Sequence, residues 1–170
     1  PTGAFLDQVL CLDSDTNTWS QKASMQTERS GLNLVLFEDE IWAIGGGNVY
    51  SASVDSVEAY NVENNTWATK ESLSTSRRWA AAWSYDGKIY SAGGRDSAHN
   101  FLSSIEVFDK NTNQWEVIQS NLPVPNYFVD TAVIDGKVYL VAGHNGSVYF
   151  DDLYAADLPA PAMNLYFKEG

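Results

Sequence analysis

The chain has 170 residues, of which 44% are hydrophobic and 13% aromatic, so it can bury the core of one domain. Its 22 acidic and 10 basic residues give a net charge of −12, which argues against binding to a nucleic-acid backbone or an anionic membrane surface. No run reaches the roughly 18 apolar residues of a membrane span.

Residues 5–20, "FLDQVLCLDSDTNTWS", form the first predicted element, a pair of short strands around a polar turn. Cys11 lies in an apolar stretch, and we expect it to be buried as a small hydrophobic residue. Because it is the one cysteine of the chain, an intrachain disulfide and a CxxC motif are both excluded.

Four strands are predicted in the next segment, at 32–37, 41–45, 55–60 and 66–70. The second of them, "IWAI", is apolar at every position, which predicts burial on both faces. It ends on Gly45, Gly46 and Gly47, a cluster that by itself would suggest a phosphate site. The turn "FEDE" lacks glycine, so we expect it to be longer than, or different from, a two-residue hairpin turn.

The remaining strands are predicted at 80–85, 88–93, 103–108 and 114–118, and then at 129–134, 137–142 and 150–156. Asp-Gly between apolar runs in "WSYDGKIY" and "VIDGKVY" predicts tight type I′ hairpins. The last segment has no tryptophan, and "MNLYFK" at 163–168 is a candidate for a divergent fourth strand.

Several residues recur at a spacing of 48 or 49. Trp19, Trp67 and Trp115 each end a similar polar phrase, and an aromatic residue, Tyr60 or Phe108, precedes the second and third of them by seven positions. The other recurring positions are the glycine pairs Gly45-Gly46 and Gly93-Gly94, matched by Ala142-Gly143, and Arg29 and Arg77, matched by Asn126. This periodicity indicates repeated structural units.

On these residues the chain resembles the kelch-repeat β-propeller family, whose blades have about 50 residues. The resemblance implies an all-β, kelch-type propeller that is partial, with about three and a half four-stranded blades. The segments would be 1–21 (last two strands of a blade), 22–70 and 71–118 (kelch blades) and 119–170 (a terminal divergent blade). Because propellers close with four to eight blades, we expect either a fragment with the missing blades upstream or self-association that completes a ring.

The recurring glycines then become markers of architecture at the end of each second strand, where a Cβ would clash. Neither "GGGNVY" nor "GGRDSAHN" has the lysine of a phosphate-binding loop. The role of Gly47, which lies outside the repeat, stays open. The large side chains of Trp67 and Trp115 are expected to fill the wedges between blades.

Loops that follow second and fourth strands share one edge of such a fold, which we call the long-loop rim, and function usually resides in long loops on a rigid scaffold. Arg29 and Arg77 recur, so they are expected to pair with backbone or carboxylates between blades. The candidate ligand-binding residues on this rim are Arg78, Arg95, Trp79, His99, Tyr127, Phe128 and His144. Arginine with aromatic residues is the composition of interaction hot spots.

The favoured function is a non-catalytic scaffold that recognises a protein or peptide. The alternatives are a carbohydrate-binding or sugar-processing module similar to the kelch sialic acid mutarotases, and a structural domain of a larger surface protein. Trp79, Trp83, Tyr127 and Phe128 are the aromatic residues considered for sugar stacking, although strand alternation places Trp83 in the core.

No catalytic motif, cofactor or metal site is predicted. His99 and His144 with Asp96, Asp151 or Asp152 lack the spacing of a ligand set, and Cys11 lies apart from both histidines, unlike the copper site of some kelch oxidases. Expected partners are a protein, a peptide or a glycan, with neither nucleic acid nor membrane. Asn64 and Asn145 fit the short glycosylation pattern, which assigns no compartment.

Overall fold

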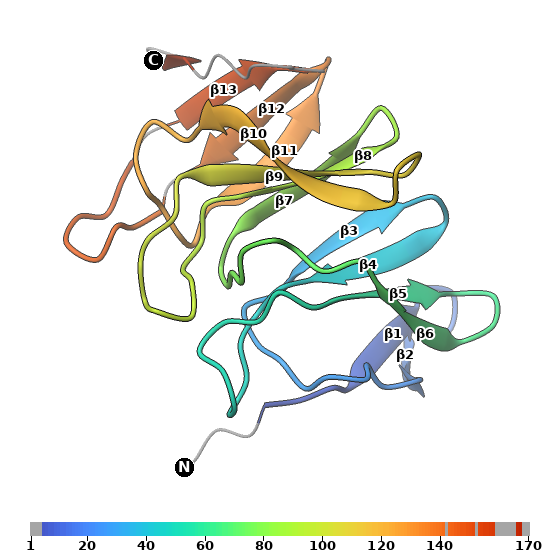
Figure 1. Cartoon of the computed structure of the whole chain (residues 1–170). Coiled ribbons are helices and arrows are strands. Elements are labelled where there is room, and N and C mark those ends of the chain that lie inside the picture. The colour runs from blue at the N-terminus through green and yellow to red at the C-terminus, as the bar shows by residue number, and fades with distance from the viewer. Residues whose placement is uncertain (1–4, 142, 152, 159–165, 168–170) are drawn as a thin grey trace.

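The structure is a computed structural model, and it describes residues 5–141, 143–151, 153–158 and 166–167 (Figure 1). Every regular element in these ranges is a β-strand, and they include no helix that could cross a membrane. The first seven strands are β1 (Val9–Asp13), β2 (Thr18–Lys22), β3 (Asn33–Phe37), β4 (Glu40–Ile44), β5 (Val57–Asn61), β6 (Thr66–Lys70) and β7 (Ala81–Tyr85). The others are β8 (Lys88–Ala92), β9 (Ser104–Asp109), β10 (Gln114–Asn121), β11 (Asp130–Ile134), β12 (Lys137–Val141), β13 (Leu153–Asp157) and β14 (Tyr166–Phe167).

The strands form four antiparallel sheets in which neighbours along the chain are neighbours in space. We call them the first blade (β1–β2), the second blade (β3–β6), the third blade (β7–β10) and the fourth blade (β11–β14). The expected all-β, partial propeller of about three and a half four-stranded blades is therefore confirmed. In the fourth blade, Tyr166–Phe167 pairs with β13, within the candidate strand 163–168, whose other residues lie outside the described ones.

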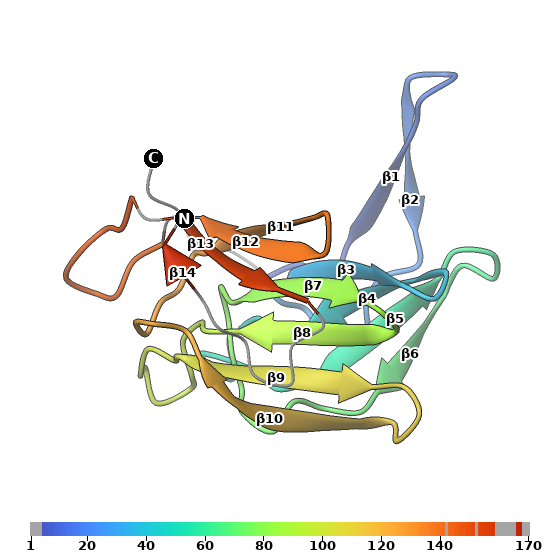
Figure 2. The ribbon, with the colours of Figure 1, turned by 90° about the horizontal axis from the view of Figure 1, so that it is seen from above.

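The first strands of the three larger blades, β3, β7 and β11, lie side by side, and each sheet extends outward from them (Figures 1 and 2). Long loops gather on one side of the stack in Figure 1, and short turns lie on the other. Figure 2 shows the β1–β2 hairpin standing apart from the stacked sheets.

Blade-on-blade packing creates the core. One buried cluster joins the second and third blades, where the Trp42 and Phe108 rings lie 5.0 Å apart. A second cluster joins the third and fourth blades and contains Trp83, which stacks on Tyr90. Trp83 is therefore a core residue, as alternation predicted, and it has no surface for a sugar.

The recurring glycine pairs adopt a backbone conformation that favours glycine. Gly45, Gly46, Gly93 and Gly94 all have positive φ, and a Cβ on Gly93 would lie 2.6 Å from the Asn126 carbonyl oxygen. These values require glycine, and they assign the pairs to the turn at the end of each second strand. The partner of Gly143 in the third pair, Ala142, lies outside the described residues.

The prediction of a longer turn in "FEDE" is wrong. Phe37 pairs directly with Glu40, so the turn has two residues, and Glu38 and Asp39 have φ of 48° and 62°. Asp86 and Gly87 in the third blade have 47° and 68°. Aspartate tolerates this conformation, and Glu38 forms an ion pair with Lys110 of the third blade, which helps to hold the turn without glycine.

The prediction that Cys11 is buried is also wrong, because β1 has a strand on one side only and nothing covers its face among the described residues. Trp19 is 66% exposed, whereas Trp115, which belongs to the buried cluster between the second and third blades, is 8% exposed. Trp67 is half-buried against the first blade, and its Nε1 donates to the Ala23 carbonyl oxygen at 2.9 Å.

Candidate binding site on the long-loop rim

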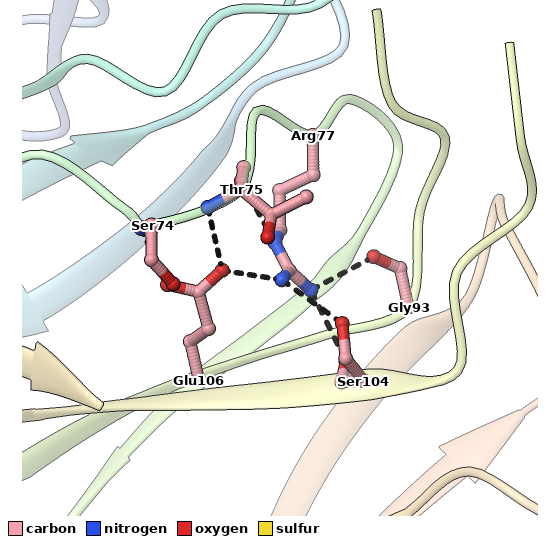
Figure 3. Close-up of polar contacts among 6 residues, drawn as sticks. All are labelled: Ser74, Thr75, Arg77, Gly93, Ser104 and Glu106. Atoms are coloured by element: carbon pink, nitrogen blue, oxygen red, sulfur yellow. Dashed lines mark hydrogen bonds and ion pairs between the residues drawn. The ribbon is translucent and has the colours of Figure 1, made fainter. Parts of the chain in front are cut away.

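Arg77 is a buried structural residue (Figure 3). Its Nη2 donates to Oε1 of Glu106 at 2.5 Å, and its Nη1 donates to the carbonyl oxygens of Gly93 and Ser104, both at 3.1 Å. Burial lowers the pKa of the Arg77 guanidinium, and the charge of Glu106 opposes that shift. The carboxylate also accepts bonds from the backbone of Ser74 and Thr75, so the buried pair is fully hydrogen-bonded.

Arg29 makes the same contacts in the second blade, with Glu58 and with the carbonyl oxygens of Gly45 and Ser56, both at 2.9 Å. Both arginines thus pair with backbone and carboxylate as predicted, although each does so within its own repeat and not between blades. The sequence analysis did not predict the glutamate partners of these arginines, although Glu58 and Glu106 are also 48 residues apart. In the fourth blade Asn126 and Tyr154 occupy the two equivalent places, and both are buried.

Three equivalent loops begin with a side chain that caps its own turn. Oδ1 of Asn48 accepts from Tyr50 and Ser51 backbone nitrogens at 3.0 and 2.9 Å. Asp96 accepts from the Asn100 nitrogen at 2.7 Å, and Asn145 accepts from the Val148 nitrogen at 3.0 Å. These caps preorganise the loops.

The sequence analysis did not predict these capping residues. The available signal was an Asn or Asp two positions after each of Gly46, Gly94 and Gly143.

The rim carries three equivalent residue pairs, each joined by a backbone bridge: Ser30–Gly47, Arg78–Arg95 and Tyr127–His144. The bridging N–H···O distances lie between 2.9 and 3.1 Å in all three. The scaffold therefore presents two side chains per blade at matched places. The pair is small in the second blade, doubly cationic in the third and aromatic in the fourth.

The cationic pair rests on aromatic rings. The Arg78 guanidinium lies 4.1 Å from the centroid of Trp79, and that of Arg95 lies 5.3 Å from Phe101. Burial lowers the pKa of Arg78, and repulsion from Arg95 adds to the effect. Among the described residues, neither guanidinium forms an ion pair with a carboxylate, and the buried Nε of Arg78 has no hydrogen-bond partner.

Glycines make room for this stack. A Cβ on Gly31 would meet the Trp79 ring at 2.5 Å. One on Gly47 would lie 2.2 Å from the Ala52 carbonyl oxygen and 3.3 Å from the Arg78 side chain. Gly47, whose role the sequence left open, is therefore required mainly by the close approach of the Ala52 backbone in its own loop.

Trp79 and Phe128 hold a strained backbone. Their φ values of 53° and 60° match the 63° of Gly31 at the equivalent position, and bulky residues rarely adopt them. The Trp79 nitrogen donates to the Gly31 carbonyl at 2.7 Å, and the Phe128 nitrogen donates to the Trp79 carbonyl at 2.9 Å. Backbone strain of this kind clusters at functional sites, where the surrounding structure maintains it.

An aromatic cluster continues from Trp79 into the fourth blade. Its ring centroid lies 4.6 Å from that of Phe128, and Tyr127 stacks on Phe101 at 5.1 Å. Nδ1 of His144 accepts from the Gly146 backbone nitrogen at 3.0 Å, so Tyr127 is the donor in its 2.9 Å bond to the same atom.

Six of the seven candidate ligand-binding residues therefore form one connected group. His99 is the exception, because its side chain is not part of the group. It contacts the group only through its backbone carbonyl oxygen, which accepts a hydrogen bond from Arg95 Nε at 3.1 Å. Asp96 lies in the same loop as His99, and Asp152 lies outside the described residues. In the described part of the chain, no three metal-ligating side chains lie together.

Stacked four-stranded sheets with a rim of long loops define a partial β-propeller. Consistent with this class, residues 31–164 match the model of the KLHDC2/KLHL20/DRC7 Kelch-repeats domain. The chain therefore belongs to the kelch-repeat family.

A solved structure titled "Structure of YjhT" matches with a TM-score of 0.80 and 14% sequence identity, which shows a shared fold. The match covers 99% of this chain and 66% of the chain in that structure, so this chain spans less than two thirds of the length of the matched protein. No curated protein matches the sequence.

Proposed function

We propose that the protein is a non-catalytic kelch scaffold that recognises a protein or peptide through the long-loop rim, where Arg78 and Arg95 bind a carboxylate. The observation that supports this most directly concerns Arg78 and Arg95, whose backbones are joined by a β-bridge. Among the described residues no carboxylate pairs with either guanidinium, although the chain has a net charge of −12. Arginine binds carboxylates bidentately, and its planar group keeps its stacking on Trp79 while it does so.

The surroundings favour a large ligand. Tyr50 and Tyr149 project from the capped loops of the second and fourth blades, 89% and 83% exposed, on either side of the arginine pair. Rigid aromatic side chains give contact area at a low entropy cost, which suits a protein or peptide surface.

The test is selection of peptides from a random phage-displayed library on the purified protein. We expect enrichment of sequences with Asp or Glu, and we expect Arg95→Ala to lose their binding while its thermal midpoint stays close to that of the original protein. Lys110→Ala is the matched control, because it removes a cation from a short turn between β9 and β10. Enrichment without acidic residues, or full binding by Arg95→Ala, would exclude the proposed site.

An acidic carbohydrate is the second candidate. It is favoured by Phe128, which is 54% exposed beside the same arginines. A glycan array decides between the two: binding of acidic glycans that is lost in Arg95→Ala supports the carbohydrate, and an array without hits leaves the peptide.

A further inference from the structure

A chemically reactive dipeptide lies in the capped loop of the fourth blade. Asn145 and Gly146 form the one Asn-Gly step of the sequence, and Gly146 is exposed to solvent. An Asn-Gly step can lose ammonia when the glycine nitrogen attacks the asparagine side-chain carbon Cγ, because no Cβ on the glycine obstructs the approach. The rate depends on removal of the proton from that nitrogen and on stabilisation of the charge that develops on the asparagine Oδ1.

A neutral histidine contacts the nitrogen that has to lose its proton. The Gly146 backbone nitrogen donates to Nδ1 of His144 at 3.0 Å. Because Nδ1 accepts this bond, it carries a lone pair, and the ring proton is on Nε2. Tyr127 Oη shares the same acceptor at 2.9 Å, and the ring centroid of Tyr149 lies 4.2 Å from that of the imidazole. His144 is therefore positioned as a general base for the Gly146 nitrogen, within hydrogen-bond reach of its proton.

Two backbone N–H groups hold the side-chain oxygen that becomes negative in this reaction. The nitrogens of Ser147 and Val148 donate to Oδ1 of Asn145 at 3.1 and 3.0 Å. The Asn145 nitrogen donates to the Val148 carbonyl oxygen at 3.2 Å, which closes the turn and fixes these donors. Donors at such distances stabilise the oxyanion of a tetrahedral intermediate. The cap that preorganises this loop therefore also activates Cγ of Asn145 toward attack.

The second blade contains the same cap without the base. Oδ1 of Asn48 accepts from two backbone nitrogens at 3.0 and 2.9 Å. However, Gly47 occupies the place of His144, and the branched side chain of Val49 follows where Gly146 follows in the fourth blade. Asn48 is therefore an internal reference in which the oxyanion donors are present but the base and the unhindered nitrogen are absent.

We propose that Asn145 is a self-modification site, at which the folded loop converts the asparagine into aspartate and isoaspartate. Nδ1 of His144 removes the proton of the Gly146 nitrogen, and that nitrogen forms a bond to Cγ of Asn145. The Cγ–Nδ2 bond then breaks, and the departing nitrogen takes up the proton that His144 removed, carried by water, and leaves as ammonia. Water finally hydrolyses the resulting succinimide at either carbonyl carbon, which gives aspartate or isoaspartate.

The product changes the charge and the backbone of the long-loop rim. A Cβ on Gly146 would lie 2.6 Å from the Phe101 ring, and the Arg95 guanidinium lies over the same ring. Either product adds a negative charge next to the glycine that packs against Phe101. Isoaspartate also lengthens the backbone by a methylene group, so it shifts Gly146 relative to this ring.

The test compares reaction rates at two asparagines of the same chain. The purified protein is incubated near neutral pH and digested, and mass spectrometry follows the conversion of each asparagine, with isoaspartate separated from aspartate by chromatography. We expect Asn145 to react about tenfold faster than in a synthetic peptide of residues 143–150, where the base and the donors are not held in place. Asn48 should stay unchanged over the same period. A slower reaction in the folded protein than in the peptide, or equal rates at Asn145 and Asn48, would overturn the proposal.

A pair of variants separates the action of His144 as a base from a role in loop structure. His144→Gln keeps a hydrogen-bond acceptor that is not basic, and it should slow the reaction about tenfold. Tyr127→Phe is the matched control, because it keeps the aromatic ring and the bond from Gly146 to His144, and it should react as fast as the original protein. Equal rates in His144→Gln and the original protein, or equal slowing in both variants, would exclude His144 as the base.

The pH profile provides the readout that a structural role would not change. In the original protein the rate should rise with pH while the imidazole loses its proton and then level off, because the neutral ring is the base. In His144→Gln the rate should rise with hydroxide concentration throughout. Profiles of the same shape in the two proteins would contradict the proposed reaction.

Discussion

The first and third blades have similar sequences but different environments. Trp19 and Trp115 end the same kind of phrase and pair with Leu12 and Phe108 in the same register, yet Trp19 is exposed and Trp115 is buried. Trp115 packs against the complete sheet of the second blade, whereas no described sheet lies on the corresponding side of the first blade. A repeat motif thus specifies the pairing of its own strands, while neighbouring blades decide whether its large side chains contribute to stability.

The largest expected effect in this comparison concerns the buried ion pair of Arg77 with Glu106. The third blade has this pair, whereas the first blade has Leu10 at the position that corresponds to Glu106. Arg77→Met should lower the free energy of unfolding by about 3–5 kcal/mol, measured by urea denaturation, since it leaves the Glu106 carboxylate buried without its counter-charge. The double variant Arg77→Asn with Glu106→Tyr copies the residues of the fourth blade and should recover much of the loss. A double variant as unstable as the single one would contradict this account.

The three tryptophans give a graded comparison. Trp115→Ala should cost about 3 kcal/mol, because it opens a cavity in the cluster between the second and third blades. Trp67→Ala should cost less, and Trp19→Ala should stay within about 0.5 kcal/mol, as for exposed residues. Equal costs at Trp19 and Trp115 in thermal or urea unfolding would show that the hairpin packs as the complete blades do.

A turn substitution sharpens the comparison between complete blades. Asp39→Gly gives the β3–β4 turn a glycine at the place that Gly87 and Gly136 hold in the other blades, and Asp39 already has a positive φ. We expect a gain of up to about 0.5 kcal/mol, because the penalty of a side chain in this conformation disappears. A loss of stability would mean that the Asp39 side chain contributes a contact in the turn.

The smallest effect concerns a feature that both regions share. Asp13 in the first blade and Asp109 in the third cap equivalent turns. A backbone hydrogen bond from Thr16 lowers the pKa of Asp13, and one from Asn111 lowers that of Asp109. Because the folded-state pKa values lie below those of the unfolded chain, the stabilising effect is present above the unfolded pKa and is lost as pH falls through the folded pKa.

A carboxyl NMR titration should therefore find both midpoints below the usual value for aspartate, despite the different packing of the two blades. A normal midpoint for Asp13 alone would show that the hairpin turn depends on the missing strands.

Much of the fold could be predicted because its signals are local. Alternating apolar residues, Asp-Gly turns and glycines at the end of second strands determine strand positions within a few residues. The two errors have different causes. At Glu38 and Asp39 a non-glycine turn adopts the same geometry with the help of a contact to the next blade, and at Cys11 an apolar strand lacks the neighbour that would bury it.

For the candidate site, the sequence predicted that Arg78, Arg95 and the aromatic residues share one rim. It could not predict that Arg78 and Arg95 are joined by a backbone bridge, since they lie in different loops of the third blade. Nor could it predict the positive φ of Trp79, because a bulky residue adopts it only where surrounding hydrogen bonds maintain it.

The sequence by itself determined the period of 48, the order of the strands and the identity of the structural arginines, because these depend on residues close in the chain or on their exact recurrence. The tertiary structure alone decided which copies of the repeat are buried and which cations remain without a carboxylate. Burial depends on the blade that packs alongside, and a repeat carries the same pattern whether or not that neighbour is present.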